Sequence, residues 1–253
     1  FEHHAFDAVL HLGAQAGVRY SIDNPFAYID SNITGMLTVL EGARHHAIKQ
    51  VVYASSSSVY GANTEQPFAA HHSTELPVSL YAATKKADEL MSHAYAHLYG
   101  ISLTGLRFFT VYGPWGRPDM AYFKFAQAIT RGEPIEVFNH GHMWRDFTYI
   151  DDIVDGVMAA LTTLHTVIDG HPPHRVFNLG NDQPERLSDM IDLLEQRLER
   201  PAQRLFLPMQ AGDVLSTHAD ISSSREQLGY APKTSLSDGL SHFVTWFRQY
   251  YGH

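Results

Sequence analysis

The fold of this chain follows from Gln50-Val51-Val52-Tyr53-Ala54-Ser55-Ser56-Ser57-Ser58-Val59-Tyr60-Gly61. The run at 50–55 has the length and composition of a buried strand in a parallel sheet, and the serine run begins where that strand ends. Open α/β sheets bind their ligands at the carboxyl ends of the strands. The segment therefore predicts a ligand-binding sheet edge that carries hydroxyl groups.

Strands and helices alternate on both sides of this segment. The expected elements are strands at 8–12, 50–55 and 103–108, small residues at 13–17, a long helix from Asn24-Pro25 toward His45, and a helix over 81–99 that stops at Gly100. This alternation predicts a parallel, doubly wound sheet.

The pattern becomes less regular after Arg117. We expect helices over 120–131, 152–164, 187–198 and 236–251, strands at 135–138 and 176–179, and a further segment at 145–149. The predicted fold class is α/β, with a partial doubly wound, Rossmann-like sheet and a smaller C-terminal lobe. The first domain would comprise 1–115 and 145–182, and the smaller lobe would comprise 116–144 and 183–253.

Composition narrows the classes of function. The chain has 253 residues, of which 44% are hydrophobic and 18% charged, as in an ordinary globular protein with a full core. Its net charge of −9 disfavours nucleic acid and anionic membranes as partners, and no apolar run approaches the ~20 residues that span a bilayer. Because the chain has no cysteine, disulfides, thiolate metal sites and a cysteine nucleophile are excluded, which fits a reducing cytoplasm.

No metal site is expected, although the chain has 17 histidines. The pairs His45-His46 and His71-His72 are adjacent in sequence, so their side chains point to different faces. The sequence also contains no His-Glu-x-x-His motif.

Tyr81 and Lys85 form a candidate acid–base pair. Residues four apart on a helix lie on one face about a turn apart, so the Lys85 ammonium can act on the Tyr81 phenol. A phenol alone titrates near pH ~10, and a neighbouring ammonium favours the phenolate that a general base at neutral pH requires. The same spacing also occurs by chance on surface helices. The serine run one loop earlier favours the catalytic interpretation.

Four motifs together resemble the extended short-chain dehydrogenase/reductase family, and within it the NAD-dependent nucleotide-sugar epimerases. They are 54–61 (ASSSSVYG), Tyr81-x-x-x-Lys85, 107–114 (RFFTVYGP) and 145–152 (RDFTYIDD). The similarity covers essentially the whole chain, and the motifs are much more specific together than singly. Residues 14–21 and 113–120 look like those of UDP-glucuronate 4-epimerases.

The resemblance implies epimerisation of UDP-glucuronate at C4 to UDP-galacturonate, through a 4-keto sugar and a tightly held NAD that takes and returns the hydride. Tyr81 would deprotonate the 4-hydroxyl, and Ser56 would hydrogen-bond it. Lys85 would bind the nicotinamide ribose and lower the pKa of the phenol. Further cofactor contacts would come from Ala14, Asn32 and Phe108.

The same resemblance implies a nucleotide-sugar site in the smaller lobe and a homodimer that forms through long helices such as 88–99. Arg145 would meet the UDP diphosphate, and Asp213 would bind the uridine ribose. The full set of substrate-binding residues would be Ser57, Ser58, Thr110, Arg117, Val137, Phe138, Arg145 and Asp213.

The substrate carboxylate gives a chemical check that needs no family. A 4-ketone next to a C5 carboxylate is a β-keto acid, which loses carbon dioxide unless its geometry is held. Arg117 could supply a bidentate fork and Thr110 a hydroxyl donor, although Arg117 could also be a solvated turn residue.

Sister enzymes that decarboxylate or dehydrate the keto sugar resemble this loop but place acidic residues just before Val-Tyr-Gly. This chain has Ser57 and Ser58 there, which favours simple epimerisation.

Several of these residues also have structural interpretations. Asp151 and Asp152 fit the capping of a helix better than a catalytic carboxylate pair. Phe138 and Phe147 fit the core better than a platform for uracil. Arg145 fits a salt bridge beside a helix about as well as a diphosphate contact.

The glycine-rich turn, Gly-x-x-Gly-x-x-Gly, that the family carries after its first strand is absent. Residues 1–7 resemble the helix end before the family's fourth strand, so two βαβ units of ~30 residues have no counterpart in this sequence. A chain that begins at Phe1 is therefore expected to bind NAD poorly and to expose one edge of its sheet. The alternatives to a UDP-glucuronate 4-epimerase are a UDP-glucose 4-epimerase and an inactive UDP-sugar-binding remnant.

Overall fold

The computed structural model describes residues 1, 3–167, 170–210 and 213–252, which fall into two compact units. Unit 1 comprises Phe1–Phe108, Asp155–Leu179 and Asp220–Tyr230, and unit 2 comprises Phe109–Val154, Gly180–Ala219 and Ala231–His253. Within the described residues, no helix has both the length and the hydropathy needed to cross a membrane.

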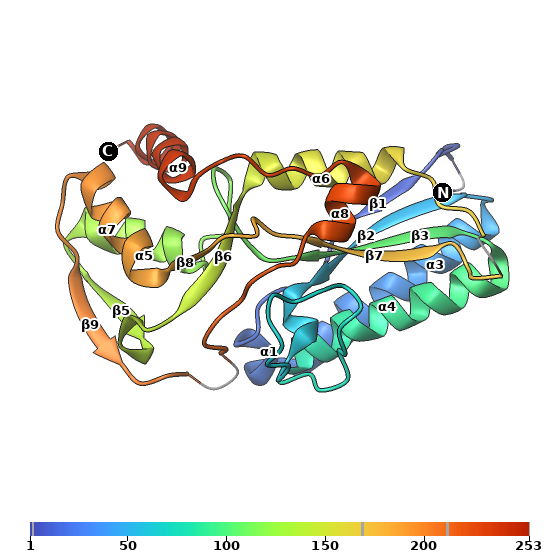
Figure 1. Ribbon diagram of the computed structural model, residues 1–253, viewed down its shortest axis with the longest axis horizontal. Coiled ribbons are helices and arrows are strands. Elements are labelled where there is room, and N and C mark those ends of the chain that lie inside the picture. Colours follow the sequence, from blue (N-terminus) through green and yellow to red (C-terminus); the bar gives the residue numbers. More distant parts are fainter. Residues whose placement is uncertain (2, 168–169, 211–212, 253) are drawn as a thin grey trace. The chain divides into compact units, whose positions relative to one another are not determined.

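Unit 1 is built on a four-stranded parallel sheet in the order β1-β2-β3-β7 (Figure 1). Its strands are β1 (Val9–His11), β2 (Gln50–Ser56), β3 (Ser102–Phe108) and β7 (His174–Leu179). Val51 pairs with Val9 on one side and with Leu103 on the other, so the serine run lies at the carboxyl edge of the sheet. The parallel pairing confirms the predicted α/β fold class.

Helices cover this sheet on both faces (Figure 1). On one face, α3 (Gly35–His45) packs against α4 (Leu80–Tyr99), and α4 packs against β2 and β3. On the other face, α8 (Ser222–Leu228) packs against β7. The core under α3 and α4 is formed by Met36, Leu40, Ala43, Ile48, Val51, Tyr53, Ala96, Ile101 and Leu103.

The α4 helix ends at Gly100 as predicted, and its start is capped by a serine that the sequence analysis did not single out. Ser79 is the N-cap, and its Oγ accepts a hydrogen bond from the amide of Ala82 at 3.1 Å. Gly100 ends the helix with a φ of 68°, a left-handed conformation that glycine adopts without strain. The bounds of α4 therefore set the positions of Tyr81 and Lys85 in its first two turns.

The helix predicted from Asn24-Pro25 to His45 is not one regular helix. After α1 (Tyr20–Asp23), the chain forms α2 (Pro25–Tyr28), the π-helical turn η1 (Ile29–Thr34) and then α3. Asn24 makes no side-chain cap, because its amide nitrogen instead donates to the Tyr20 hydroxyl at 2.9 Å. The wider π-helical turn contains Asn32, whose side chain is buried.

Unit 2 has two small sheets. The first contains β4 (Thr110–Tyr112), β6 (Trp144–Tyr149) and β8 (Pro184–Arg186), with β4 parallel and β8 antiparallel to β6. The second is a parallel pair, β5 (Pro134–Phe138) and β9 (Gln203–Leu207). The sequence did not predict β4 and β8, because three residues are too few to show a periodic pattern.

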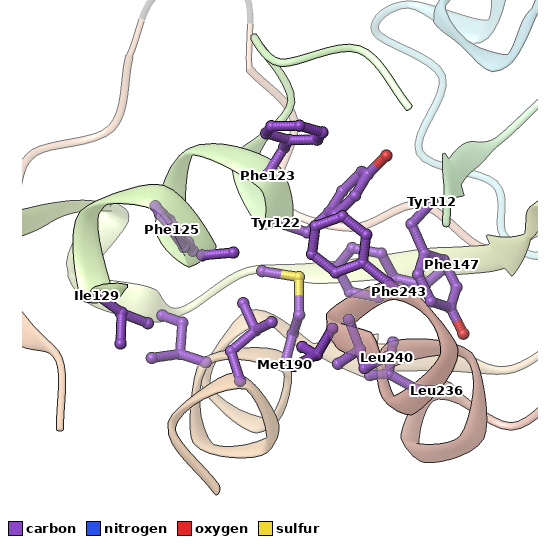
Figure 2. Packing of buried hydrophobic residues seen from close by; sticks show 14 of the residues in the cluster. Tyr112, Tyr122, Phe123, Phe125, Ile129, Phe147, Met190, Leu236, Leu240 and Phe243 are labelled. Atoms are coloured by element: carbon purple, nitrogen blue, oxygen red, sulfur yellow. The ribbon is translucent and has the colours of Figure 1, made fainter. Parts of the chain in front are cut away.

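Helices α5 (Ala121–Arg131), α7 (Leu187–Leu198) and α9 (Leu236–Tyr251) supply much of the core of unit 2 (Figure 2). Phe243 of α9 meets the Tyr122 ring edge-on, with 4.9 Å between the centroids. A Cβ at Gly239 would lie 2.1 Å from the Tyr112 hydroxyl, so α9 needs glycine there to approach β4. The remaining helix, α6, spans Ile150–Thr162.

Candidate active site

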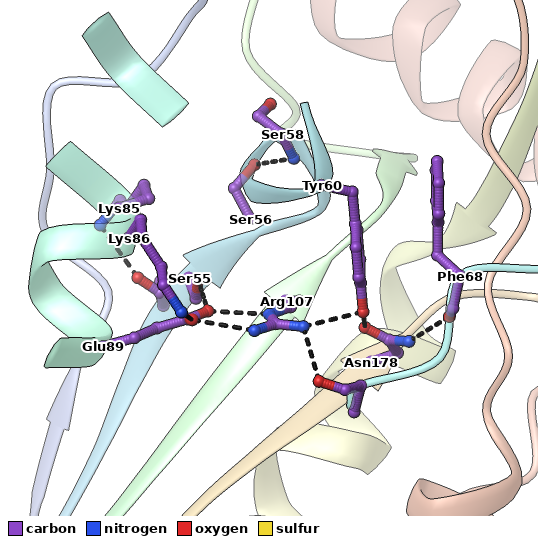
Figure 3. Close-up of polar contacts among 12 residues, drawn as sticks. Ser55, Ser56, Ser58, Tyr60, Phe68, Lys85, Lys86, Glu89, Arg107 and Asn178 are labelled. Atoms are coloured by element: carbon purple, nitrogen blue, oxygen red, sulfur yellow. Dashed lines mark hydrogen bonds and ion pairs between the residues drawn. The ribbon is translucent and has the colours of Figure 1, made fainter. Parts of the chain in front are cut away.

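The serines after β2 form a short 3₁₀ turn at the carboxyl edge of the unit 1 sheet. This turn, η2, spans Ser57–Tyr60, and the Ser56 Oγ caps it by accepting a hydrogen bond from the Ser58 amide at 3.2 Å (Figure 3). The first two serines of the run are buried, and the last two are half-buried. Phe108 pairs with Ser56 in register and is half-buried at the end of β3.

Helix α4 brings Lys85 to the same edge. The Lys85 Nζ donates hydrogen bonds to the Ala54 carbonyl oxygen at 2.9 Å and to Asp88 Oδ2 at 3.1 Å. Lys85 is only 3% exposed, and Tyr81, one turn earlier on α4, is half-buried. His11, at the end of β1, has its pKa lowered by burial and by the Lys85 ammonium, so the positive charge also acts on the neighbouring strand.

Tyr28 connects Tyr81 to the small residues that follow β1. The two rings meet edge-on at 6.1 Å, and the Tyr28 hydroxyl contacts the carbonyl oxygens of Ala16 at 3.0 Å and Gly17 at 2.5 Å. Sequence reasoning gave Tyr28 no role, because within a predicted helix an aromatic residue is most simply explained as core.

Asn32 fixes the backbone of the same segment. Its Oδ1 accepts from the Gln15 amide at 2.8 Å, and its Nδ2 donates to the Gln15 carbonyl at 3.1 Å and to Thr84 Oγ1 at 2.9 Å. Ala14, the other predicted cofactor contact in this region, is exposed. The buried Asn32 amide therefore ties the loop that presents Ala14 to helix α4.

A buried polar network lies behind the serine turn (Figure 3). The Glu89 carboxylate accepts from Ser55 Oγ at 2.7 Å and from Arg107 Nε and Nη2 at 2.8 and 2.9 Å. Arg107 Nη1 donates to the Tyr60 hydroxyl at 3.0 Å, which donates to Asn178 Oδ1 at 2.6 Å. The network joins α4, three strands and η2, and so fixes the backbone that carries Ser56.

Glu89 and Arg107 each stabilise the charged form of the other inside this network. Burial alone would raise the pKa of Glu89, but the Arg107 guanidinium and the Ser55 hydroxyl lower it. Burial opposes the charge of Arg107, but Glu89 raises the pKa of its guanidinium. Sequence reasoning gave Glu89 and Arg107 no role. An arginine in an otherwise uncharged strand was the available signal, because a buried guanidinium requires a buried partner.

The predicted carboxylate-binding residues lie in unit 2. Arg117 is exposed in the turn after β4, and its Nε and Nη2 donate to the two Asp119 oxygens at 2.9 and 2.5 Å. These bonds lower the pKa of the Asp119 carboxyl. Thr110 is half-buried at the start of β4, where it pairs with Phe147. Arg117 thus already forms a carboxylate fork, with a residue of this chain.

The remaining predicted residues of unit 2 differ in their exposure. Val137 is buried in the core and pairs with Phe206 in the β5–β9 sheet, and Phe138 is half-buried against the same core. Arg145 Nη1 donates to the carbonyl oxygens of Trp144 at 2.8 Å and Leu215 at 3.3 Å. Asp213 is half-buried.

Phe147 is 3% exposed in the core of unit 2, as expected. Among the described residues, Asp152 does not make the helix cap expected of it. Its carboxylate accepts instead from the amides of Lys233 at 3.2 Å and Thr234 at 3.0 Å, so it holds a loop of unit 2. Over the described residues, no three acidic or histidine side chains gather as a metal site would require.

Comparison with known proteins agrees with this architecture. The family described as the NAD dependent epimerase/dehydratase family matches residues 1–180. An uncharacterized protein of Methanocaldococcus jannaschii is 55% identical over 95% of this chain and 72% of its own length. A protein of Arabidopsis thaliana named UDP-glucuronate 4-epimerase 4 is 51% identical over 98% of this chain, but the match spans only 59% of the plant protein.

A solved structure is similar over nearly the whole chain. It is the UDP-glucuronic acid 4-epimerase of Bacillus cereus in complex with UDP-glucuronic acid and NAD, which is 37% identical to this chain. The TM-score is 0.86, and the match covers 97% of this chain and 76% of the other. These matches confirm the resemblance inferred from the motifs. The chain therefore belongs to the NAD dependent epimerase/dehydratase family, among the extended short-chain dehydrogenases/reductases.

Proposed function

We propose that this protein epimerises UDP-glucuronate at C4 to UDP-galacturonate through a 4-keto sugar, with NAD as cofactor. The observation that carries the proposal is the position of the buried Lys85. Its ammonium donates to the Ala54 carbonyl at the sheet edge that bears the serines, and Lys85 lies on the same helix as Tyr81. The choice of sugar is supported by the Arabidopsis relative and by the Bacillus cereus complex.

In this proposal, Tyr81 and Ser56 handle the proton of the sugar 4-hydroxyl. The Tyr81 phenolate accepts that proton as the hydride leaves C4, and Ser56 hydrogen-bonds the same oxygen. The Lys85 ammonium favours the phenolate. After the keto sugar rotates, Tyr81 returns the proton to the oxygen as the hydride returns to the other face, so the overall reaction is an isomerisation.

Residues of unit 1 fit a dinucleotide. NAD, when bound, supplies the hydride acceptor and donor. Among the described residues, Lys85 uses two of its three N–H donors, which leaves one for a ribose hydroxyl. A Cβ at Gly13 would meet nothing closer than the His11 ring at 3.7 Å, so a ligand can approach the backbone beside Ala14. Asn32 and Phe108 are the other residues that we assign to the cofactor.

The substrate contacts are assigned by their chemistry. Arg117 and Thr110 would hold the sugar carboxylate, and a firm grip is needed because a β-keto acid otherwise loses carbon dioxide. Ser57 and Ser58 would line the sugar without supplying an acid for elimination. The nucleotide would be bound by Val137, Phe138, Arg145 and Asp213.

The test is to mix the protein and NAD separately with UDP-glucuronate and UDP-glucose and to follow the anomeric proton signals. We expect UDP-galacturonate to form, and Tyr81→Phe to slow its formation by about 10²- to 10⁴-fold, because the general base is lost. Turnover of UDP-glucose alone would refute the carboxylate role of Arg117 and Thr110. If neither sugar reacts while UDP still binds in calorimetry, the protein is a UDP-sugar-binding remnant.

A further inference from the structure

Lys85 is paired with a second buried charge on its own helix. Asp88 lies one turn after Lys85, and its Oδ2 is 3.1 Å from the Lys85 Nζ. Asp88 is 1% exposed and Lys85 is 3% exposed, so water does not screen this pair. The ammonium that we assign to Tyr81 therefore has a fixed counter-charge.

One carboxylate oxygen of Asp88 accepts a hydrogen bond, and the other has no hydrogen-bond partner among the described residues. Oδ2 accepts from Lys85, whereas Oδ1 is buried and has no hydrogen-bond partner among the described residues. A buried carboxylate oxygen without a donor destabilises the ionised form. A proton on Oδ1 would leave the Oδ2 bond to Lys85 intact. The geometry thus permits Asp88 to change its charge without releasing Lys85.

The groups around Asp88 act in opposite directions on its charge. Burial raises the pKa of Asp88 to about 6, the Lys85 ammonium opposes that rise, and the Glu89 carboxylate adds to it. The Asp88 carboxylate also contributes to the raised pKa of Tyr53 on β2. The Glu89 carboxylate is itself bound by Arg107. Asp88 therefore changes its charge just below neutral pH.

We propose that Asp88 is a positioning residue that holds the Lys85 ammonium at the end of β2 and offsets part of the charge that Lys85 presents to Tyr81. The inference rests on the proposed function, in which Tyr81 is the base and Lys85 its tuning cation. When Asp88 is ionised, the pair is close to neutral and favours the phenolate less. When Asp88 is protonated, the full charge of Lys85 acts on the phenol.

The first test is the pH dependence of kcat/KM for UDP-glucuronate in wild type and Asp88→Asn, both saturated with NAD. Asparagine keeps an oxygen for Lys85 but removes the charge, so the acidic limb should move to lower pH by about half a unit to one unit. Glu41→Gln is the matched control, because it removes a carboxylate from α3 that interacts with Arg44 and Tyr95 rather than with Lys85. Its acidic limb should coincide with that of the wild type.

An Asp88→Asn profile with the wild-type midpoint would overturn the proposal, whether activity is retained or lost at every pH. Uniform loss would indicate a structural role only. A shift of the same size in Glu41→Gln would also overturn it, because the effect would then reflect net charge and not the pair.

The second test needs neither cofactor nor turnover. The carboxyl carbon of Asp88 is followed by NMR in aspartate-labelled protein, with Asp88→Asn to assign the signal. We expect a midpoint near pH 6 in the wild type and a higher midpoint in Lys85→Met, which lacks the opposing ammonium. An unchanged midpoint in Lys85→Met would overturn the proposal. Because no substrate is used, a failure of the proposed epimerase activity would not disturb this result.

Discussion

The Arg107 guanidinium meets the Glu89 carboxylate at two points, with Nε 2.8 Å from Oε1 and Nη2 2.9 Å from Oε2. Both residues are 3% exposed. A pair of this kind contributes little net stability when it is complete, because both charges were taken out of water, but it is costly to break. Its main consequence is geometric, since the same carboxylate accepts from Ser55, next to the proposed catalytic Ser56.

Glu89→Gln should lower the free energy of unfolding by about 3 to 5 kcal/mol, because it leaves the buried Arg107 charge without a counter-ion. Urea unfolding at neutral pH measures this change. Glu75→Gln is the matched control, since Glu75 is exposed and its loss should change stability by no more than about 0.5 kcal/mol. Equal losses of unfolding free energy in the two variants would show that the buried pair matters no more for stability than an exposed carboxylate.

Ser55→Ala and Ser56→Ala should separate support from chemistry at adjacent positions. Ser55→Ala removes a donor to a charged, buried acceptor and should cost about 1–3 kcal/mol of stability, with kcat within about threefold of wild type. Ser56→Ala removes the hydroxyl assigned to the substrate and should lower kcat about 100-fold. It should cost only about 1 kcal/mol, the worth of its cap on η2.

Unfolding curves and initial rates measured on the two variants check this division. A loss of kcat in Ser55→Ala as large as that in Ser56→Ala would contradict it. Catalysis would then need the supporting hydroxyl of Ser55 as much as the hydroxyl of Ser56 that is assigned to the substrate.

The strands and helices around the serine run could be predicted because each carries a strong local signal. The run at 50–55 became β2 over Gln50–Ser56, and the helix ending at Gly100 became α4 over Leu80–Tyr99. The π-helical turn around Asn32 could not be predicted, because its single wider turn leaves the apolar pattern of the helix nearly unchanged.

The sequence could name Tyr81 and Lys85 as candidates because their residue types and spacing already imply chemistry, and the structure places both on α4. The residues that support the candidate site could not be predicted, because their roles arise from contacts far apart in sequence. Arg107 and Glu89 are 18 residues apart, and Tyr60 and Asn178 are 118 apart. Such pairs depend on the register of the sheet and the face that α4 presents to it, and no local pattern contains either.

His174 on β7 should make the protein sensitive to acid. Burial lowers the pKa of His174 to about 4, and its Nε2 lies 2.9 Å from the Tyr53 hydroxyl. The folded state therefore holds the ring neutral, below the ~6.5 of an unfolded chain. This contribution to stability is present above pH ~6.5 and is lost as pH falls through about 4, where it can amount to about 3 kcal/mol.

His174→Gln should remove that dependence while keeping a polar partner for Tyr53. Urea unfolding at pH 7.5, 5.5 and 4.5 should show the variant gaining stability relative to wild type as pH falls. His97→Gln, at an exposed position on α4, should follow the wild-type curve. Parallel curves for wild type and His174→Gln would contradict the assignment of a neutral, half-buried ring.

Arg117 should decide between charged and neutral sugars, and Asp119 should moderate that choice. Arg117→Met should lower kcat/KM for UDP-glucuronate about 100-fold, the worth of charge-assisted bonds to a carboxylate, and leave any turnover of UDP-glucose within about threefold.

In the structure, the Arg117 fork is occupied by Asp119, so in the proposed reaction the substrate carboxylate must replace an internal one. The side chains of this pair are 44% and 56% exposed, and an exposed pair is worth at most about 1 kcal/mol. Asp119→Asn should therefore lower KM for UDP-glucuronate by no more than about fivefold and leave UDP-glucose unaffected. Steady-state rates with both sugars measure these effects. An equal loss of kcat/KM for the two sugars in Arg117→Met would show that Arg117 does not bind the carboxylate, and an equal fall in KM for the two sugars in Asp119→Asn would show that Asp119 does not compete with it.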